Sequence, residues 1–192
     1  MKHLVSTLFL SVALSSLPAW SAVEVKGAKF GDTYALANQS LQLNGVGVRV
    51  KVIVDVYAAG LYLPRKEASA SGILAMPGAK SMQIVLLRNL SGEDFADAMI
   101  KGFRKNHSSA EIARFQPKLD EIKGLMLAFG EVKKGAVIHI DHQPGSGTFV
   151  LVNGERKGPV IVGDDFYAAL LKIWLGEHPV DDDLKAALLG GK

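Results

Sequence analysis

The order of the expected elements predicts an α+β protein built on a mainly antiparallel sheet. Stretches typical of strands fill residues 23–65, helical stripes follow between residues 91 and 130, and a strand-rich hairpin region leads into two final helices. Because the helices are grouped and do not alternate with strands, a doubly wound parallel fold is not expected. The chain has 192 residues, 48% of them hydrophobic, which is enough for one domain with a sizeable core.

Residues 1–21 are predicted to be a signal peptide, so the domain is expected to occupy residues 23–192. Lys2 and His3 precede the apolar run LVSTLFLSVALSSL, and small residues around Pro18 follow it. The alternative is an uncleaved anchor, but the apolar run is short for a bilayer span. The chain contains no cysteine, which excludes disulfides and thiol catalysis and, with export, favours the bacterial periplasm.

The strand region between residues 23 and 65 contains one unusually long extended segment. Asn44-Gly45 is a turn dipeptide, and residues 46–63 then read as a strand that is longer than usual. This length predicts that the strand is bent, bulged or split by a tight turn. A short helix is expected over residues 67–76 and a further strand over residues 81–90.

The second half of the chain carries clear start and stop signals. Ser91 and Ser108 each begin a capping box, and Pro117 is expected to kink or split the helix after Ser108. Strands are predicted at 136–142, 148–152 and 155–162, with Asn153-Gly154 as the turn of a hairpin. Asp164 and Asp181 are expected to cap the last two helices.

Charge and motifs exclude several classes of function. The formal charge is only +3 and no run of five like charges occurs, so nucleic acid is not a predicted partner. No stretch after the N-terminal run is long and apolar enough to cross a membrane. Standard motifs for nucleotides, nucleophilic serines and zinc are absent, so no cofactor is predicted. The HIDH segment at 139–142 is interpreted as exposed strand positions and Asp181–Asp183 as a helix start, so no metal site is predicted.

One segment carries the main functional question. If residues 46–63 form a continuous strand, Arg49, Ile53 and Tyr57 lie on one face, and Val50, Val52, Val54 and Val56 pack on the core from the other. The Arg49 face then either meets solvent or lines a pocket for an apolar molecule with an anionic head. Periodicity alone leaves both interpretations open.

Four segments together resemble the chalcone isomerase superfamily, in particular its bacterial chalcone isomerase-like branch. They are LNGVGVRVKVIVDVYAAGLYLP (43–64), LSGEDFADAMIKGFRKNH (90–107), KGPVIVGDDFYAALLKIWLG (157–176) and DDDLKAALLG (181–190). The resemblance implies an open-faced β-sandwich, in which a large antiparallel sheet carries helices packed on one face around a ligand cleft.

The catalytic residues implied by the resemblance are mostly missing. The arginine of the chalcone isomerase site corresponds to Arg49, but its threonine falls on Tyr57 and its tyrosine on Phe95. Its asparagine falls on Gly102, with Asn106 one turn further on. No catalytic residue is therefore predicted, and cyclisation of a chalcone is not expected.

Three hypotheses follow for the function. Arg49 and Tyr57 resemble the carboxylate-binding pair of the non-catalytic members, which implies an exported protein that binds a fatty acid or similar apolar anion. The alternative is an isomerase or intramolecular lyase acting on a small enone or phenol, with Tyr57, Tyr62 or Arg88 contributing an acid or base. The third is a scaffold whose cleft is filled by large side chains. Oligomeric state is not predicted.

Overall fold

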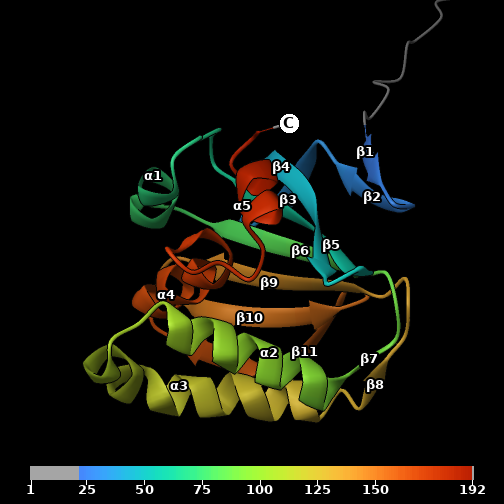
Figure 1. Cartoon of the computed structure of the whole chain (residues 1–192). Helices are drawn as coiled ribbons and strands as arrows, with labels where there is room; N and C mark the ends of the chain where they lie inside the picture. The colour runs from blue at the N-terminus through green and yellow to red at the C-terminus, as the bar shows by residue number, and fades with distance from the viewer. Residues whose placement is uncertain (1–21, 192) are drawn as a thin grey trace, which may run out of the picture.

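The computed structural model describes residues 22–191, and the predicted signal peptide lies outside the described residues (Figure 1). Its centre is a seven-stranded antiparallel sheet with the order β11-β10-β9-β6-β5-β4-β3. The strands of this sheet are β3 (Thr33–Leu36), β4 (Gln39–Lys51), β5 (Val54–Leu63), β6 (Lys80–Leu86), β9 (Val137–Gln143), β10 (Gly147–Val152) and β11 (Glu155–Val162). Two small pairs accompany it, β1 (Ala22–Val25) with β2 (Ala28–Gly31) and β7 (Leu90–Ser91) with β8 (Glu131–Val132).

Helices cover one face of the sheet and enclose the larger core. Figure 1 shows α2 (Gly92–Lys105) and α3 (Ser109–Leu127) side by side, with α4 (Asp164–Leu175) next to them. The short helix α5 (Asp182–Leu188) packs on β4 and β5, whereas the short helix α1 (Ala70–Ala75) contacts α4. A smaller core cluster around Phe30 and Tyr62 lies on the opposite face, under β2 and β3. The predicted α+β architecture, a large antiparallel sheet with helices on one face, is therefore confirmed.

The long segment 46–63 is a hairpin split by a tight turn. β4 ends at Lys51 and β5 begins at Val54, and these two residues are cross-strand partners. The intervening Val52 has a φ of 62°, and Val52 and Ile53 are 92% and 89% exposed. The expectation that Val50, Val52, Val54 and Val56 pack on the core was therefore wrong for three of them. Only Val56 is buried.

Asn44-Gly45 does not form the predicted turn. Both residues lie inside β4, at an irregularity in its pairing with β5. The amide of Asn44 donates to the carbonyl oxygens of Glu67 and Leu188 at 2.9 and 2.8 Å. Gly45 lies directly under α5, where an added Cβ would come within 2.0 Å of the Ala187 carbonyl oxygen. The glycine is needed for close packing of helix against strand.

The helix boundaries follow their capping signals. Ser108 and Glu111 form the complete capping box before α3, and Ser91 caps α2 by accepting from the Asp94 amide. α3 runs through Pro117 as one helix, so it is not split there. The Asn153-Gly154 turn joins β10 and β11, with both residues at positive φ as a type I′ turn requires.

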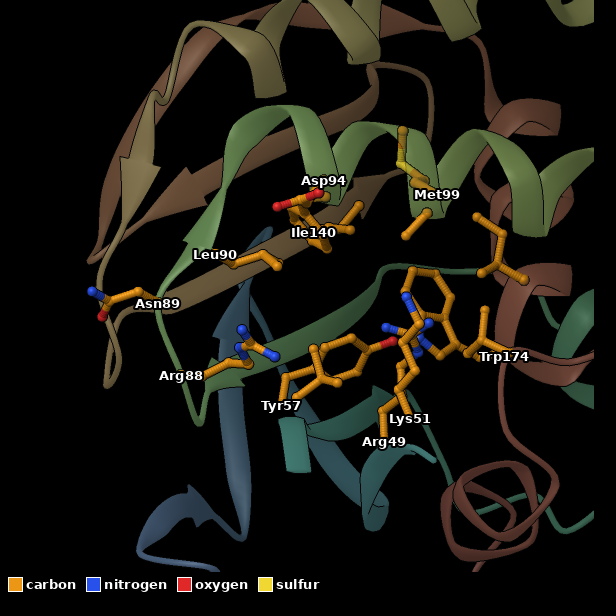
Figure 2. Close-up of a pocket in the computed structure, with 15 residues that line it drawn as sticks. Arg49, Lys51, Tyr57, Arg88, Asn89, Leu90, Asp94, Met99, Ile140 and Trp174 are labelled. Carbon is orange, nitrogen blue, oxygen red and sulfur yellow. The ribbon is translucent and has the colours of Figure 1, made fainter. Parts of the chain in front are cut away.

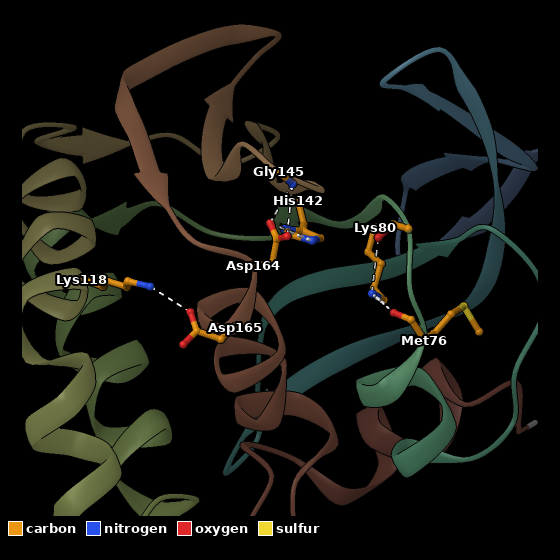
Figure 3. A network of polar contacts seen from close by, with 8 residues as sticks. Met76, Lys80, Lys118, His142, Gly145, Asp164 and Asp165 are labelled. Atoms are coloured by element: carbon orange, nitrogen blue, oxygen red, sulfur yellow. Dashed lines mark hydrogen bonds and ion pairs between the residues drawn. The ribbon is translucent and has the colours of Figure 1, made fainter.

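The start of α4 differs from the prediction. The N-cap position is Gly163, and no side chain caps the helix. Asp164 instead accepts from the Gly145 amide at 3.0 Å and lies 4.0 Å from His142 Nε2, while Asp165 pairs with Lys118 at 2.9 Å (Figure 3). Both carboxylates fall in the first turn, where a helix favours negative charge. They tie α4 to the β9–β10 turn and to α3.

Candidate functional site

The β4–β5 hairpin places Arg49 directly opposite Tyr57. The two residues are cross-strand partners, and the guanidinium carbon of Arg49 lies 5.6 Å from the centre of the Tyr57 ring. Cross-strand partners project from the same face of a sheet. The face they share is the one covered by the helices, because Tyr57 belongs to the larger core cluster.

Tyr57 is held as a neutral phenol whose proton is free to be donated. Only 4% of the residue is exposed, and its oxygen accepts a hydrogen bond of 2.9 Å from Nε1 of Trp174. Burial raises the pKa of Tyr57 to about 12, although the charge of Arg49 and the bond from Trp174 act in the opposite direction. Since Trp174 occupies the oxygen as an acceptor, the O–H remains available for a ligand.

Arg49 carries a buried hydrogen-bond donor without a partner. Among residues 22–191, its Nε is shielded from solvent and makes no hydrogen bond, and no carboxylate forms an ion pair with its guanidinium. Leaving a buried donor unsatisfied is costly, more so when the group is charged. The guanidinium is therefore suited to a planar anion such as a carboxylate, which accepts from its fork of donors.

Arg49 and Tyr57 line a common cavity of about 300 Å³ between the hairpin and helices α2 and α4 (Figure 2). Figure 2 shows the Tyr57 hydroxyl pointing toward Arg49 and Trp174, with Met99 and Ile140 on the far side. The charged groups around it are three cations and one carboxylate. The complete lining is Arg49, Lys51, Val56, Tyr57, Arg88, Asn89, Leu90, Asp94, Phe95, Ala98, Met99, Ile140, Ile173, Trp174 and Val180.

A second, more polar groove of about 340 Å³ continues outward from this cavity. The two share part of their lining, namely Arg49 and Lys51 of β4, Asp94 and Ala98 of α2, and Val180. The outer groove adds Lys101, Lys105 and the carboxylate of Asp97 from α2, and it shares Asp94 with the cavity. Its lining is thus net positive, which favours anions near the opening of the inner cavity.

The fold separates the other positions named from the resemblance or for the enzyme alternative. Phe95 and Arg88 line the cavity, but Tyr62 lies on the opposite face of the sheet and bonds to Gly31 and Gln83. Gly102 packs against Ile173 and leaves no room for a side chain.

The hydrogen-bonding groups of the Asn106 side chain are occupied at the end of α2. It bonds to the Gly102 carbonyl and to both backbone groups of His178. The cavity therefore has a hydroxyl and cations to bind an anion. Its only tyrosine has a pKa near 12 and is a weak proton acceptor at neutral pH.

The sequence reasoning overlooked Trp174 as a site residue. The sequence pattern assigns it no role, whereas its indole N–H positions the Tyr57 hydroxyl. The available signal was chemical, because a buried tryptophan usually finds a partner for its N–H.

The HIDH segment is buried, which contradicts the prediction of exposed positions. Asp141 is 1% exposed and His142 5% exposed, because β3 and the helix side each cover one face of β9. Tyr34 of β3 stacks on His139 and donates to Asp141 Oδ2 at 2.9 Å. Burial raises the pKa of Asp141 to about 6 and lowers that of His139 to about 4.

Ser81, His139 and Asp141 do not form a nucleophilic triad despite their residue types. Ser81 Oγ and Asp141 Oδ1 both approach Nδ1 of the histidine, at 3.2 and 3.9 Å. A relay requires the serine and the acid on opposite ring nitrogens. Among the residues that the structure describes, no three His, Asp or Glu side chains gather as metal ligands would. Within the same residues, no helix combines the length and apolarity needed to cross a membrane.

Comparison with known proteins agrees with this architecture. A model of the family described as chalcone isomerase-like matches residues 22–190. Among solved structures, the chain is similar to a fatty-acid binding protein of Arabidopsis thaliana, with a TM-score of 0.67 and 18% sequence identity over 88% of this chain and 96% of that one. At this identity the likeness concerns the fold. No curated protein matches the chain.

Proposed function

This chain belongs to the chalcone isomerase-like family, and we propose that it is an exported protein that binds a medium-chain fatty acid, or a similar apolar anion, beside Arg49 and Tyr57. The observation that carries the proposal is the buried Nε of Arg49, which has no partner within residues 22–191. A carboxylate in the cavity would accept from the guanidinium and from the Tyr57 hydroxyl. It would thereby satisfy both donors at once.

The rest of the lining suits an alkyl tail. Phe95, Met99, Ile140 and Ile173 present apolar surface around the polar pair. A site for a small molecule typically has this composition, with a mostly apolar wall and few polar groups that fix orientation. A scaffold whose cleft is filled by large side chains would have no such open volume beside Arg49 and Tyr57. The fatty-acid binding neighbour of the same fold supports this class of ligand.

The cavity volume limits the length of the acid. A volume of about 300 Å³ holds roughly ten groups of the size of a water molecule, at about 30 Å³ each. An acid of about eight carbons has ten non-hydrogen atoms and fills this space. Much longer chains must extend through the opening, where the lining is more polar.

Export and a periplasmic location are part of the proposal and rest on residues 1–21 and the absence of cysteine. Intact mass of protein recovered from a bacterial periplasm tests this part separately. A mass that retains the first 21 residues would contradict it.

The binding proposal is tested by native mass spectrometry without added lipid, followed by calorimetric titration with saturated acids of increasing length. We expect binding strongest near eight to ten carbons, and a loss of about 10–100-fold in Arg49→Met, the range for a hydrogen bond to a charged group. The methyl ester of the best acid should bind Arg49→Met and the unchanged protein alike.

Arg104→Met is the matched control, since this exposed arginine of α2 does not line the cavity. It should leave the affinity for acids unchanged. Equal affinity of Arg49→Met and the unchanged protein for every acid, or no binding of any acid, would refute the proposal.

A further inference from the structure

The tip of the β4–β5 hairpin exposes aliphatic side chains to solvent. Val52 and Ile53 are 92% and 89% exposed, and the flanking Val50 and Val54 are exposed at 42% and 40%. Single exposed aliphatic residues are common on protein surfaces, but four within five consecutive residues form an apolar patch. Such patches mark contacts with another apolar surface.

The backbone of the tip is also unfavourable for the residue that it carries. Val52 is the first residue of a two-residue turn and has a φ of 62°. This conformation suits Gly, Asn or Asp, whereas a β-branched residue there is strained. Val52 is thus a poor turn residue, and its fully exposed side chain makes no compensating contact with the core. The tip combines strain with an exposed apolar side chain, as contact sites often do.

The tip directly follows two positively charged residues of β4 that line the cavity. Lys51 and Arg49, the residues that lead into the turn, line both the cavity and the outer groove, as Figure 2 indicates for the cavity. Lys101 and Lys105 of α2 extend the positive lining away from the hairpin. An apolar tip next to such cations matches the surface of an anionic bilayer, where acyl chains lie below negative head groups.

We propose that the β4–β5 hairpin tip docks this protein on anionic lipid membranes, with Val52 and Ile53 inserted among the acyl chains and Lys51, Lys101 and Lys105 facing the head groups. Docking in this orientation brings Lys51, which lines the cavity, close to the lipid. The contact is peripheral and reversible, since two aliphatic side chains supply only a small inserted area. It does not depend on which ligand the cavity holds.

Flotation with lipid vesicles tests the proposal, using vesicles of phosphatidylglycerol and phosphatidylcholine in equal parts and vesicles of phosphatidylcholine alone. All variants are exported in the same host and checked by intact mass, so that they share one N-terminus. The unchanged protein should bind the anionic vesicles, and added salt should weaken the binding because it screens the lysines.

The double variant Val52→Asn and Ile53→Asn should reduce partitioning by at least about tenfold, since it removes both inserted side chains. Val162→Asn is the matched control, because Val162 is 71% exposed but lies on β11, at the other edge of the sheet. It should change partitioning by less than about twofold. Thermal unfolding confirms the fold, and Asn at position 52 should not lower stability because it tolerates positive φ.

Three results would overturn the proposal. The first is that the unchanged protein does not bind anionic vesicles, or binds neutral ones equally well. The second is that the double variant still binds as the unchanged protein does. The third is a self-association, measured by light scattering, that needs Val52 and Ile53 and occurs without vesicle binding, which would assign the tip to a second copy of the chain.

Discussion

Replacing Asp141 by Asn is expected to make the stability of this protein fall on acidification. In the unchanged protein, burial raises the pKa of Asp141 from 3.8 to about 6. On acidification, the folded state therefore binds a proton at this site at a higher pH than the unfolded state does. The resulting stabilisation is complete below pH 3.8 and is lost as the pH rises through about 6.

His139 acts in the opposite direction. Burial lowers its pKa from 6.5 to about 4, so the unfolded chain takes up the proton first. The stability that depends on its neutral form is present above pH 6.5 and is lost as the pH falls toward 4. The two neighbours thus compensate each other over the same range of pH.

The magnitudes follow from these values by linkage. Between about pH 7.5 and about pH 4.5, Asp141 contributes a gain, and His139 a loss, of about 2–3 kcal/mol each. In the unchanged protein, these two contributions to the free energy of unfolding nearly cancel. Asp141→Asn removes the gain, so its free energy of unfolding should fall by about 2–3 kcal/mol more than that of the unchanged protein over this interval.

Urea denaturation at the two pH values measures the effect, with each variant compared with itself. His139→Asn is the converse variant, and acidification should stabilise it by about 2–3 kcal/mol relative to the unchanged protein. Contributions of other titrating groups cancel in these differences. If both variants showed the pH dependence of the unchanged protein, the opposite pKa shifts of Asp141 and His139 on folding would be refuted.

Three further substitutions test the packing and the caps. Gly45→Ala should destabilise by about 3 kcal/mol, because its Cβ meets the Ala187 carbonyl oxygen at 2.0 Å; a neutral result in thermal unfolding would disprove the close approach of α5. Gly124→Ala is the opposite case, since nothing lies within 4 Å of the added Cβ in α3, and it should stabilise by about 0.5–1 kcal/mol in urea. Ser108→Ala should cost about 1 kcal/mol by removing the capping box with Glu111, and Ser109→Ala, just inside the helix, should cost less.

The helices were predictable because their signals are local. Ser91, Ser108 and Asp181 each bond to a backbone amide three residues ahead, so the sequence nearby contains the whole interaction. The Asn153-Gly154 turn was predictable for the same reason. Asp164 was misread because Gly163, at φ 110°, takes the cap position, and its carboxylate serves the distant Gly145 instead.

The prediction that Arg49 and Tyr57 share one face of the sheet was correct, but the geometry behind it was wrong. The pattern placed them on one face of a single strand, whereas they face each other across a hairpin. Val52-Ile53 gives no turn signal, because β-branched residues are disfavoured at positive φ. Residue propensities therefore do not indicate the turn at Val52-Ile53. Asn44-Gly45 has the composition of a turn but lies inside β4. The binding role of both residues stays a prediction.

The burial of the HIDH segment was not readable from its residues. Polar side chains on an antiparallel strand normally indicate a solvated face. Here Tyr34, more than a hundred positions earlier in the chain, covers that face and bonds to Asp141. Only the tertiary placement of β3 decides the outcome, and no periodicity within β9 contains that information.

Asn44 has a consequence for the order in which this protein is able to fold. Its side chain joins β4 to the Leu188 carbonyl, 144 positions later, and Gly45 receives α5 at the same place. Contacts so distant along the chain form late, because a long loop must close first. During synthesis, β4 remains without its covering helix until α5 has left the ribosome. The packing of β4 is therefore complete only when α5 has been synthesised and has docked on it.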